Sequence, residues 1–379
     1  MNFSIEQKEL ASLTNLVYRA ASNKNAIPVL AGLLLNLDPD KGLTITATDM
    51  EIGMRVSTNN VEIVKPGSVL VNALYFHNFI KSLPAIRINL QYDEETAKLN
   101  VIYGRSTGFI NTYRDFEYPN LPIDNMEDRI TIPQTALKEA LRKTAFAAAV
   151  THFRQVFTGI LFDIKSSGQL KVVASDTHRL AYFNYEMEKP LKEDFKFIIP
   201  QRTANEILRV LDDSEEPFKI AFNENNVVFH REGFLLMSRL IEGQYPVYEQ
   251  VIPQSFSTFI NIKAQTLAEI LERARTMPGD DSLKMQYIQL TVANNELRVN
   301  AYSELMGELD ERVEEVSIEG EQEQKISFNT NYFLDAVRVL QAESEDIQLQ
   351  LSGALGPAMI NNPADEKYLY VLVPLRTSN

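Results

Sequence analysis

Residue types that commonly carry out catalysis are few in this sequence, and they do not cluster. None of the 379 residues is a cysteine, which excludes thiol catalysis, disulfides and Cys-ligated zinc or iron–sulfur sites. The four histidines lie too far apart for metal-ligand spacing; they are His77, His152, His178 and His230. The chain has no glycine-rich phosphate loop, no HExxH motif and no GxSxG motif. We therefore expect no metal and no cofactor, and an enzyme is the minority hypothesis.

Carboxylates remain as possible acid–base groups. Asp49 and Glu51 form one close pair, and Asp176 stands beside His178 and Arg179 in a second polar run. Such pairs also arise by chance among 51 acidic residues, where they commonly occupy solvated turns at strand ends. A carboxylate-dependent hydrolase at the Asp49 or Asp176 turns is kept as an alternative, and a cleft with two carboxylates within about 10 Å would favour it.

One pattern of residues occurs three times along the chain. Gly32–Leu35 recurs as Gly159–Phe162, 127 positions later, and as Tyr287–Leu290, a further 128 positions on. Each copy opens on alternating apolar residues and contains two helical stretches with alternating strands around them. Self-similarity over such a long period decides the architecture. It predicts an α+β fold of three tandem copies, each with two helices packed on antiparallel sheets.

Apolar residues at helical spacing mark the two helices of each copy. The first helices carry Leu10, Leu13 and Val17, then Leu137, Leu141 and Ala145, then Leu267, Leu271 and Ala274. The second helices carry Phe76, Phe79, Ile80 and Leu83, then Ile207, Leu208 and Leu211, then Phe333, Val337 and Leu340. Short polar connectors separate the copies, so the sequence predicts domains at 1–122, 129–250 and 256–379. No run of 18 apolar residues occurs, and no membrane-spanning helix is expected.

Charge is distributed unevenly between the helices and the rest of the chain. The net charge of −14 argues against a conventional nucleic-acid binder, which usually has a basic balance. The predicted helices are nevertheless slightly positive. Their cations include Lys81, Lys138, Arg142, Lys143, Arg202, Arg209 and Arg338. Two further cations, Lys24 and Arg154, lie on the loops that follow first helices. All these cations are either solvated charges of ordinary amphipathic helices or one positive face directed at a polyanion.

Four motifs narrow the choice further. They are ASDTHRLA at 174–181, GQYPVYEQVIP at 243–253, FNTNYFLDAV at 328–337 and VPLR at 373–376. Together with the three repeats and the acidic, cysteine-free composition, they closely resemble the bacterial DNA sliding clamp, the beta subunit of DNA polymerase III. The resemblance implies three clamp domains and a head-to-tail homodimer that closes into a ring around double-stranded DNA. It also implies a non-catalytic processivity factor for DNA replication, in the cytoplasm and associated with the nucleoid.

The dimensions of a helix-lined ring can be estimated independently of the resemblance. Six helices spaced at about 10 Å would leave an opening of only about 9 Å, whereas twelve helices from two chains leave about 28 Å. A B-DNA duplex about 20 Å wide passes only the larger opening. Sequence-independent contacts between a few Lys or Arg side chains and phosphates would let such a ring slide.

The resemblance assigns residues to three surfaces. It implies a peptide-binding groove between the second and third domains, formed by Phe157, Ser175, Thr177, His178, Arg179, Leu180, Pro246, Val251, Tyr332, Val371, Val373, Pro374, Leu375 and Arg376. With the helix cations, it implies a DNA-facing surface of Lys24, Lys81, Lys138, Arg142, Thr151, Arg154, Gln155, Arg202, Arg209 and Arg338. It implies a dimer interface at Phe109 and Ile110 on one side and Thr276 and Met277 on the other.

The partners implied are the replicative polymerase, an ATP-driven clamp loader, and other polymerases and repair proteins that carry a clamp-binding peptide. This chain departs from the family pattern in four places. Val373 and Leu375 replace common methionines, Gln155 and Val156 replace an aromatic pair, Thr276 is more polar than usual, and Thr377–Asn379 extends the chain. A repeat protein that scaffolds other proteins without DNA is the other alternative, and it predicts that the cations do not converge.

Overall fold

The computed structural model describes residues 1–22, 27–123, 126–278 and 285–376. This part of the chain contains six α-helices, short 3-10 helices and 26 strands, and every strand pair in it is antiparallel. The expected α+β class is confirmed. Contacts divide the chain into two compact units, Met1–Thr135 with Asn205–Leu240 (unit 1) and Ala136–Ala204 with Ile241–Asn379 (unit 2). The domain boundaries derived from the repeats stay a prediction, because these units divide the second repeat between them.

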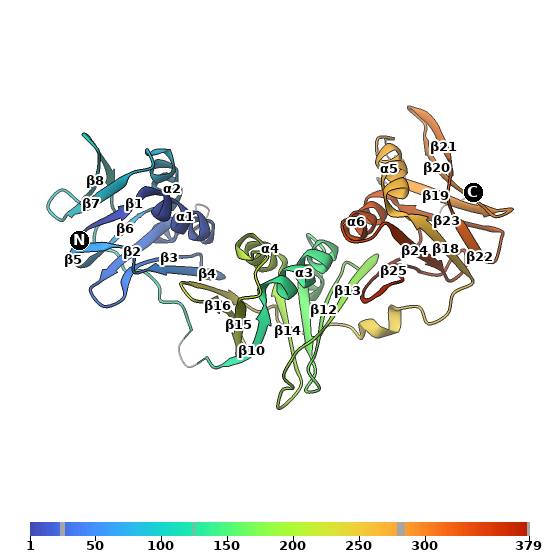
Figure 1. The fold of residues 1–379 in the computed structure, drawn as a ribbon, viewed down its shortest axis with the longest axis horizontal. Coiled ribbons are helices and arrows are strands. Elements are labelled where there is room, and N and C mark those ends of the chain that lie inside the picture. The colour runs from blue at the N-terminus through green and yellow to red at the C-terminus, as the bar shows by residue number, and fades with distance from the viewer. Residues whose placement is uncertain (23–26, 124–125, 279–284, 377–379) are drawn as a thin grey trace. The chain divides into compact units, whose positions relative to one another are not determined.

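Unit 1 holds two of the four sheets (Figure 1). The five-stranded sheet has the order β5 (Glu62–Lys65), β1 (Asn2–Glu6), β7 (Arg87–Asp93), β8 (Lys98–Tyr103) and β9 (Ser106–Asn111). The eight-stranded sheet has the order β10 (Asp128–Pro133), β15 (Pro217–Phe222), β16 (Asn226–Arg231), β17 (Phe234–Arg239), β4 (Ile52–Thr58), β3 (Gly42–Thr48), β2 (Gly32–Asp38) and β6 (Gly67–Asn72). Pairing of β17 with β4 joins the second repeat to the first through backbone hydrogen bonds.

Unit 2 holds the other two sheets and is organised in the same way. Its nine-stranded sheet has the order β14 (Phe195–Pro200), β11 (Gly159–Ile164), β12 (Gln169–Ser175), β13 (Arg179–Glu186), β26 (Asp365–Leu372), β25 (Ala358–Asn362), β24 (Asp346–Leu351), β18 (Thr258–Lys263) and β22 (Ser317–Gly320). Its four-stranded sheet has the order β21 (Gly307–Val313), β20 (Glu296–Ser303), β19 (Tyr287–Ala293) and β23 (Gln324–Asn329). Here the pairing of β13 with β26 joins the second repeat to the third.

Two helices form in each repeat, as the apolar spacing predicts. They are α1 (Gln7–Val17), α2 (Ala73–Ser82), α3 (Gln134–Thr144), α4 (Gln201–Val210), α5 (Ala264–Ala274) and α6 (Thr330–Gln341), with 3-10 turns η1 (Tyr18–Ala20), η2 (Pro28–Ala31), η3 (Ala145–Ala147), η4 (Gln155–Thr158) and η5 (Tyr248–Val251). The side chains of Asn72 and Asn329 cap α2 and α6 in the same way, each accepting a hydrogen bond at 3.1 Å from the backbone N–H three residues later. No helix in the described ranges is long and apolar enough to cross a membrane.

One lysine is buried among acids at the junction of the second and third repeats in unit 2. The Lys143 side chain on α3 is only 1% exposed, and its Nζ lies 2.6 Å from carboxylate oxygens of both Glu139 and Glu343 and 3.7 Å from Asp365. Burial alone would lower the pKa of Lys143, but hydrogen bonds and charges of Glu139 and Glu343 raise it overall. The three carboxylates come close enough together to suggest a metal site, but the Lys143 ammonium lies among them and pairs with each.

We predict that Lys143→Ala lowers the free energy of unfolding of unit 2 by about 3 kcal/mol, because it removes the cation and leaves the carboxylates to repel one another. Urea denaturation followed by circular dichroism measures the change. Lys367→Ala removes an exposed lysine from β26 and should change the same quantity by less than about 0.5 kcal/mol. Equal, small effects of the two substitutions would show that the acid cluster does not depend on Lys143.

Candidate peptide-binding groove and nucleic-acid surface

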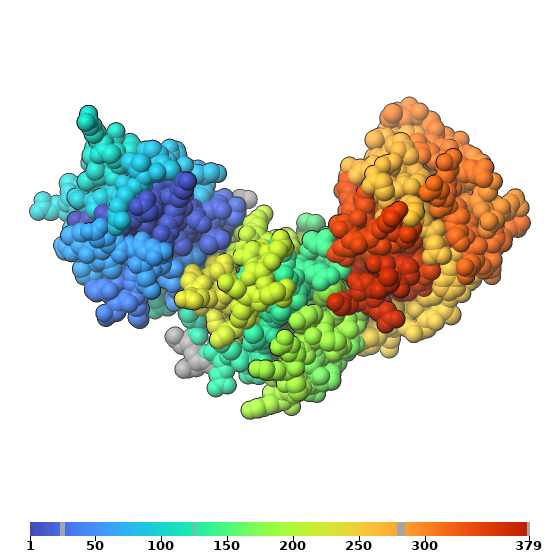
Figure 2. Space-filling view, viewed as in Figure 1, coloured from blue at the N-terminus to red at the C-terminus, as the bar shows by residue number. Residues whose placement is uncertain are grey.

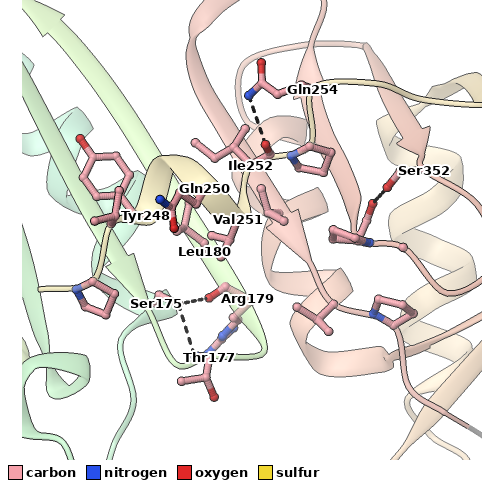
Figure 3. A pocket seen from close by; sticks show the side chains of 18 of the residues that line it. Ser175, Thr177, Arg179, Leu180, Tyr248, Gln250, Val251, Ile252, Gln254 and Ser352 are labelled. Carbon is pink, nitrogen blue, oxygen red and sulfur yellow. Dashed lines mark hydrogen bonds between the residues drawn. The ribbon is translucent and has the colours of Figure 1, made fainter.

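A groove of about 600 Å³ lies within unit 2, between strands of the second and third repeats (Figure 3). One wall comes from the end of β12 and the start of β13, a second from η5 and the segment after it, and a third from the chain end and the loop after β24. The lining is mostly apolar, and its polar side chains are Ser175, Thr177, Arg179, Gln250, Gln254, Ser255 and Ser352. An extended peptide with alternating apolar side chains suits such a surface.

Ten of the fourteen residues expected in this groove line it. They are Phe157, Ser175, Thr177, Arg179, Leu180, Pro246, Val251, Val371, Val373 and Pro374. His178, Tyr332, Leu375 and Arg376 do not line it. The backbone N–H of Leu375 donates to the Ser327 carbonyl at 2.8 Å, which pairs this residue with β23.

The prediction missed two stretches that line the groove. The first completes the segment between the repeats, with Tyr245, Val247, Tyr248, Gln250, Ile252, Pro253, Gln254 and Ser255, and the second is the loop with Ser352, Leu355, Gly356 and Pro357. The first stretch overlaps the motif at 243–253, so its composition already marked it. The loop after β24 carries only ordinary glycine and proline turn signals, which gave no reason to place it at the groove.

The turn between β12 and β13 fixes the groove's polar corner by internal hydrogen bonds. Asp176 Oδ1 accepts from the backbone N–H groups of His178 and Arg179, both at 3.0 Å, and Ser175 Oγ donates to the Arg179 carbonyl at 2.7 Å. Thr177 adopts the left-handed conformation with φ 77° that this tight turn requires. The carboxylate of Asp176 is therefore engaged in holding a turn.

The equivalent turn of the first repeat is built identically in unit 1. Asp49 Oδ1 accepts from the N–H groups of Glu51 at 3.0 Å and Ile52 at 2.9 Å, and Met50 has φ 80°. Thr48 Oγ1 donates to the Ile52 carbonyl at 2.8 Å, in the role of Ser175. Asp49 and Asp176 therefore both serve to form turns, and these two turns supply no acid–base pair in a cleft.

Arg179 supports the groove by tying its two sides together. The guanidinium donates to Asp176 at 2.9 Å, to Asp335 on α6 at 2.7 Å and to the Phe146 carbonyl at 2.8 Å. It also lies over the Tyr332 ring, 4.1 Å from the centroid. These contacts use Nε and both terminal nitrogens, so Arg179 holds the wall of the groove in position.

Comparisons with known proteins bear on the whole chain. Three family models of the DNA polymerase III beta subunit match this chain. The model of the N-terminal domain matches residues 1–122, that of the central domain 131–247 and that of the C-terminal domain 249–376. The chain belongs to the DNA polymerase III beta subunit family. The beta sliding clamp of Halalkalibacterium halodurans is 31% identical over the full length of both chains.

Solved structures agree with this assignment. The DNA polymerase sliding clamp of Bacillus subtilis has a TM-score of 0.91 at 28% identity, and the beta subunit from Streptococcus pyogenes has 0.92 at 26%, each with 100% coverage of both chains. The expectation of a sliding clamp that serves DNA polymerase III as a processivity factor is confirmed. Since this role is non-catalytic, the hydrolase alternative is set aside, and so is the scaffold that works without DNA.

The cations expected to face DNA in this clamp are partly engaged in ion pairs. Arg142, Arg209 and Arg338 pair with Glu343, Glu206 and Glu272, respectively. The remaining described residues of the set are Lys81, Lys138, Thr151, Arg154, Gln155 and Arg202, and all but the half-buried Lys138 are exposed. Lys24 lies outside the described residues. The DNA-facing assignment stays a prediction for the whole set.

An aromatic pair beside Arg154, the half-buried His152 and the exposed Phe153, was not anticipated from the sequence. The ring of Phe153 is 90% exposed and stacks on His152 at 4.5 Å between centroids. His152 in turn meets the edge of Phe157, a groove residue, at 4.8 Å. Although Gln155 and Val156 replace the aromatic pair usual in the family, the loop before them thus carries two rings.

The residues expected at the clamp's dimer interface lie on β9 and on the segment after α5, where Phe109 and Thr276 are exposed and Ile110 and Met277 are half-buried. Phe109 and Ile110 belong to β9, the outermost strand of its sheet, where the Lys98 ammonium lies 4.2 Å from the Phe109 ring centroid. Thr276 and Met277 follow α5, and the Thr276 hydroxyl donates to the Arg273 carbonyl at 2.7 Å. That internal bond satisfies the polar group that distinguishes Thr276 from an aliphatic residue.

A buried carboxylate anchors the η5 wall of the groove. The Tyr248 hydroxyl donates to Asp163 Oδ2 at 3.0 Å, and Lys196 and Lys165 lie 2.9 and 3.3 Å from the same carboxylate. Burial alone would raise the pKa of Asp163, but the hydrogen bonds from Lys196 and Tyr248 and the charges of Lys196 and Lys165 lower it below its ordinary value.

We predict that Asp163 stabilises the clamp above its unfolded pKa of about 3.9 and that this contribution is lost as the pH falls through its lower folded-state pKa. Asp163→Asn should therefore cost about 1–3 kcal/mol of unfolding free energy at pH 7, and the difference from the unsubstituted protein should shrink below about pH 4. Urea denaturation at a series of pH values tests this. A difference that is independent of pH would exclude the charge of Asp163 as its cause.

Proposed function

We propose that two copies of this chain close head to tail into a ring around double-stranded DNA and tether other proteins through the groove in unit 2. The observation that carries the proposal is the groove itself. It joins strands of two repeats into an apolar surface with few polar side chains and sits on a chain of the DNA polymerase III beta subunit family. Tethering by a bound peptide and retention by ring closure require no strong affinity for the duplex.

The occupants of the groove are short segments of the replicative polymerase, the clamp loader and other polymerases or repair proteins. Apolar side chains at alternate positions of an extended peptide can enter the space around Leu180, Val251 and Val371. Glutamine side chains can bond with Gln250, Gln254 or the Thr177 hydroxyl. The groove is therefore expected to prefer peptides with apolar and glutamine residues.

The DNA contacts are expected to be weak and independent of sequence. Lys and Arg side chains that are already paired with carboxylates, as Arg142 and Arg338 are, attract phosphates less strongly than solvated cations do. Phe153 offers a ring on which an unpaired base can stack beside Arg154. The net charge of −14 disfavours adsorption of DNA elsewhere on the surface. Such a protein works on chromosomal DNA, in the cytoplasm at the nucleoid.

Leu180→Asp is expected to weaken the binding of a fluorescent peptide that contains glutamine, leucine and phenylalanine by at least about tenfold. The reason is that the new carboxylate would be buried against the apolar side chains of the peptide. Fluorescence anisotropy measures the affinity. Val64→Asp changes an exposed apolar residue on β5 of unit 1 and should leave peptide affinity unaltered. If both variants bind the peptide as the unsubstituted protein does, the groove is not the binding site.

The topological part of the proposal predicts retention that depends on closed DNA. The protein is loaded with a clamp loader and ATP onto nicked circular DNA, the circle is linearised, and the bound fraction is followed by gel filtration. Retention on circles with loss from linear ends is expected of a sliding ring. Equal retention on both forms would indicate ordinary surface binding, and no retention with a loader proven active on another clamp would contradict the proposed ring.

A further inference from the structure

The groove wall that contains η5 is not attached to the rest of unit 2 through its backbone. The gold-coloured segment with η5 runs over the surface of unit 2 from the second repeat to the third (Figures 1 and 2). From 242 to 256, the backbone hydrogen bonds found in the described structure stay within the segment. Gln250 N–H donates to the Val247 carbonyl at 3.3 Å, and Ile252 N–H to the Glu249 carbonyl at 3.4 Å. Side chains must therefore fix the position of this wall.

Two buried tyrosines hold the segment against the sheet beneath it. Tyr245 and Tyr248 are 8% and 3% exposed and belong to the apolar cluster that includes Phe157, Leu180 and Val371. Apolar packing is non-directional, so it keeps the segment on the sheet without selecting one exact position. A hydrogen bond is restricted in both distance and angle. A hydrogen bond from one of these side chains would therefore determine where the wall lies.

The Tyr248 hydroxyl makes a bond of this kind. It donates to Asp163 Oδ2 at 3.0 Å, and the Asp163 side chain on β11 is fully buried and does not line the groove. Lys196 Nζ on β14 lies 2.9 Å from the same oxygen, and Lys165 Nζ lies 3.3 Å from Oδ1. The two cations hold the carboxylate in its charged form, and a charged acceptor makes a stronger hydrogen bond than a neutral one.

The other polar side-chain contacts of the segment hold it less firmly. Lys171 on β12 lies 3.8 Å from the Glu249 carboxylate, which is 46% exposed, so solvent screens this pair. The Gln254 side chain donates to the Ile252 carbonyl at 3.2 Å, which is a bond within the segment itself. The bond from Tyr248 to Asp163 is therefore the strongest directional contact between the segment and the sheet in the described part of the chain.

We propose that Tyr248, held by Asp163, is a positioning residue that sets the affinity of the groove for its peptide. The proposal rests on the peptide binding of the proposed function. Val251 lies three residues after Tyr248 on the same 3-10 turn, lines the groove and is 53% exposed. A displacement of Tyr248 would thus move a side chain against which the peptide packs. Because the bond fixes the turn in the free protein, binding does not have to order this wall.

Tyr248→Phe keeps the ring in the apolar cluster and removes only the hydroxyl. It should raise the dissociation constant of a fluorescent peptide that contains glutamine, leucine and phenylalanine by about threefold to tenfold, because the wall is no longer fixed before binding. Fluorescence anisotropy measures the constant, and circular dichroism establishes that the variant is folded.

Tyr118→Phe is the matched control. The Tyr118 hydroxyl accepts from the Thr48 N–H at 3.0 Å and donates to the Gly32 carbonyl at 3.2 Å in unit 1, so this variant also loses a bonded tyrosine hydroxyl. It should bind the peptide as the unsubstituted protein does. A folded Tyr248→Phe variant with the peptide affinity of this control would overturn the proposal.

Two combinations of substitutions separate positioning from a general loss of stability. Asp163→Leu should raise the dissociation constant by the same factor as Tyr248→Phe, and the two together should raise it no further, because each removes the same bond. Val251→Ala removes the contact that the bond positions, so Tyr248→Phe should have a smaller effect in that background. An undiminished effect of Tyr248→Phe in both backgrounds would contradict the proposal. If Asp163→Leu does not fold, the Val251→Ala background alone decides.

Failure of this proposal is distinguishable from failure of the proposed function. If the unsubstituted protein binds the peptide and Leu180→Asp weakens binding while Tyr248→Phe does not, the groove stands and only the role of Tyr248 is wrong. If the unsubstituted protein does not bind the peptide, or Leu180→Asp binds it equally well, the proposed function of the groove itself fails.

Discussion

The groove in unit 2 depends on backbone pairing between β13 and β26, two strands that come from different repeats. Their register sets Leu180 opposite Val371, and both side chains join a buried cluster with Phe157, Tyr245 and Tyr248. β26 therefore extends a sheet begun in the second repeat into the third, and the residues just beyond it become a groove wall. A shift of one residue in this register would turn every side chain of β26 to the opposite face.

Two buried cations, Lys143 and Arg179, also stabilise the packing of the second repeat against the third in unit 2. Lys143 holds together acids of α3, of the segment just after α6 and of β26, while Arg179 connects the β12–β13 turn with α6 through Asp335. Both cations are buried, so losing a partner leaves a charge without compensation in a poorly hydrated place. The groove is thereby preorganised, which lowers the entropic cost of binding an extended peptide.

The carboxylates that the hydrolase alternative relied on illustrate how a turn can resemble an active site in sequence. Asp49 and Asp176 each bind two backbone N–H groups, in turns that repeat between the two units with the same hydroxyl partner and the same left-handed residue. Conservation of geometry between repeats points to folding as the reason for these residues. An acid–base role would instead require a carboxylate that retains free lone pairs in a cleft.

Period and composition in the sequence determined the three repeats, the α+β class and the six helices, because amphipathic spacing is a local property that each segment carries within itself. The motifs at 174–181, 243–253 and 373–376 also located most of the groove. Only the tertiary structure brought the loop at Ser352–Pro357 to the groove, joined Tyr248 to Asp163 and surrounded Lys143 with acids. These contacts join residues that are far apart in the chain. Strand register and packing determine which residues meet, and neither produces a periodic pattern in the sequence of the two segments.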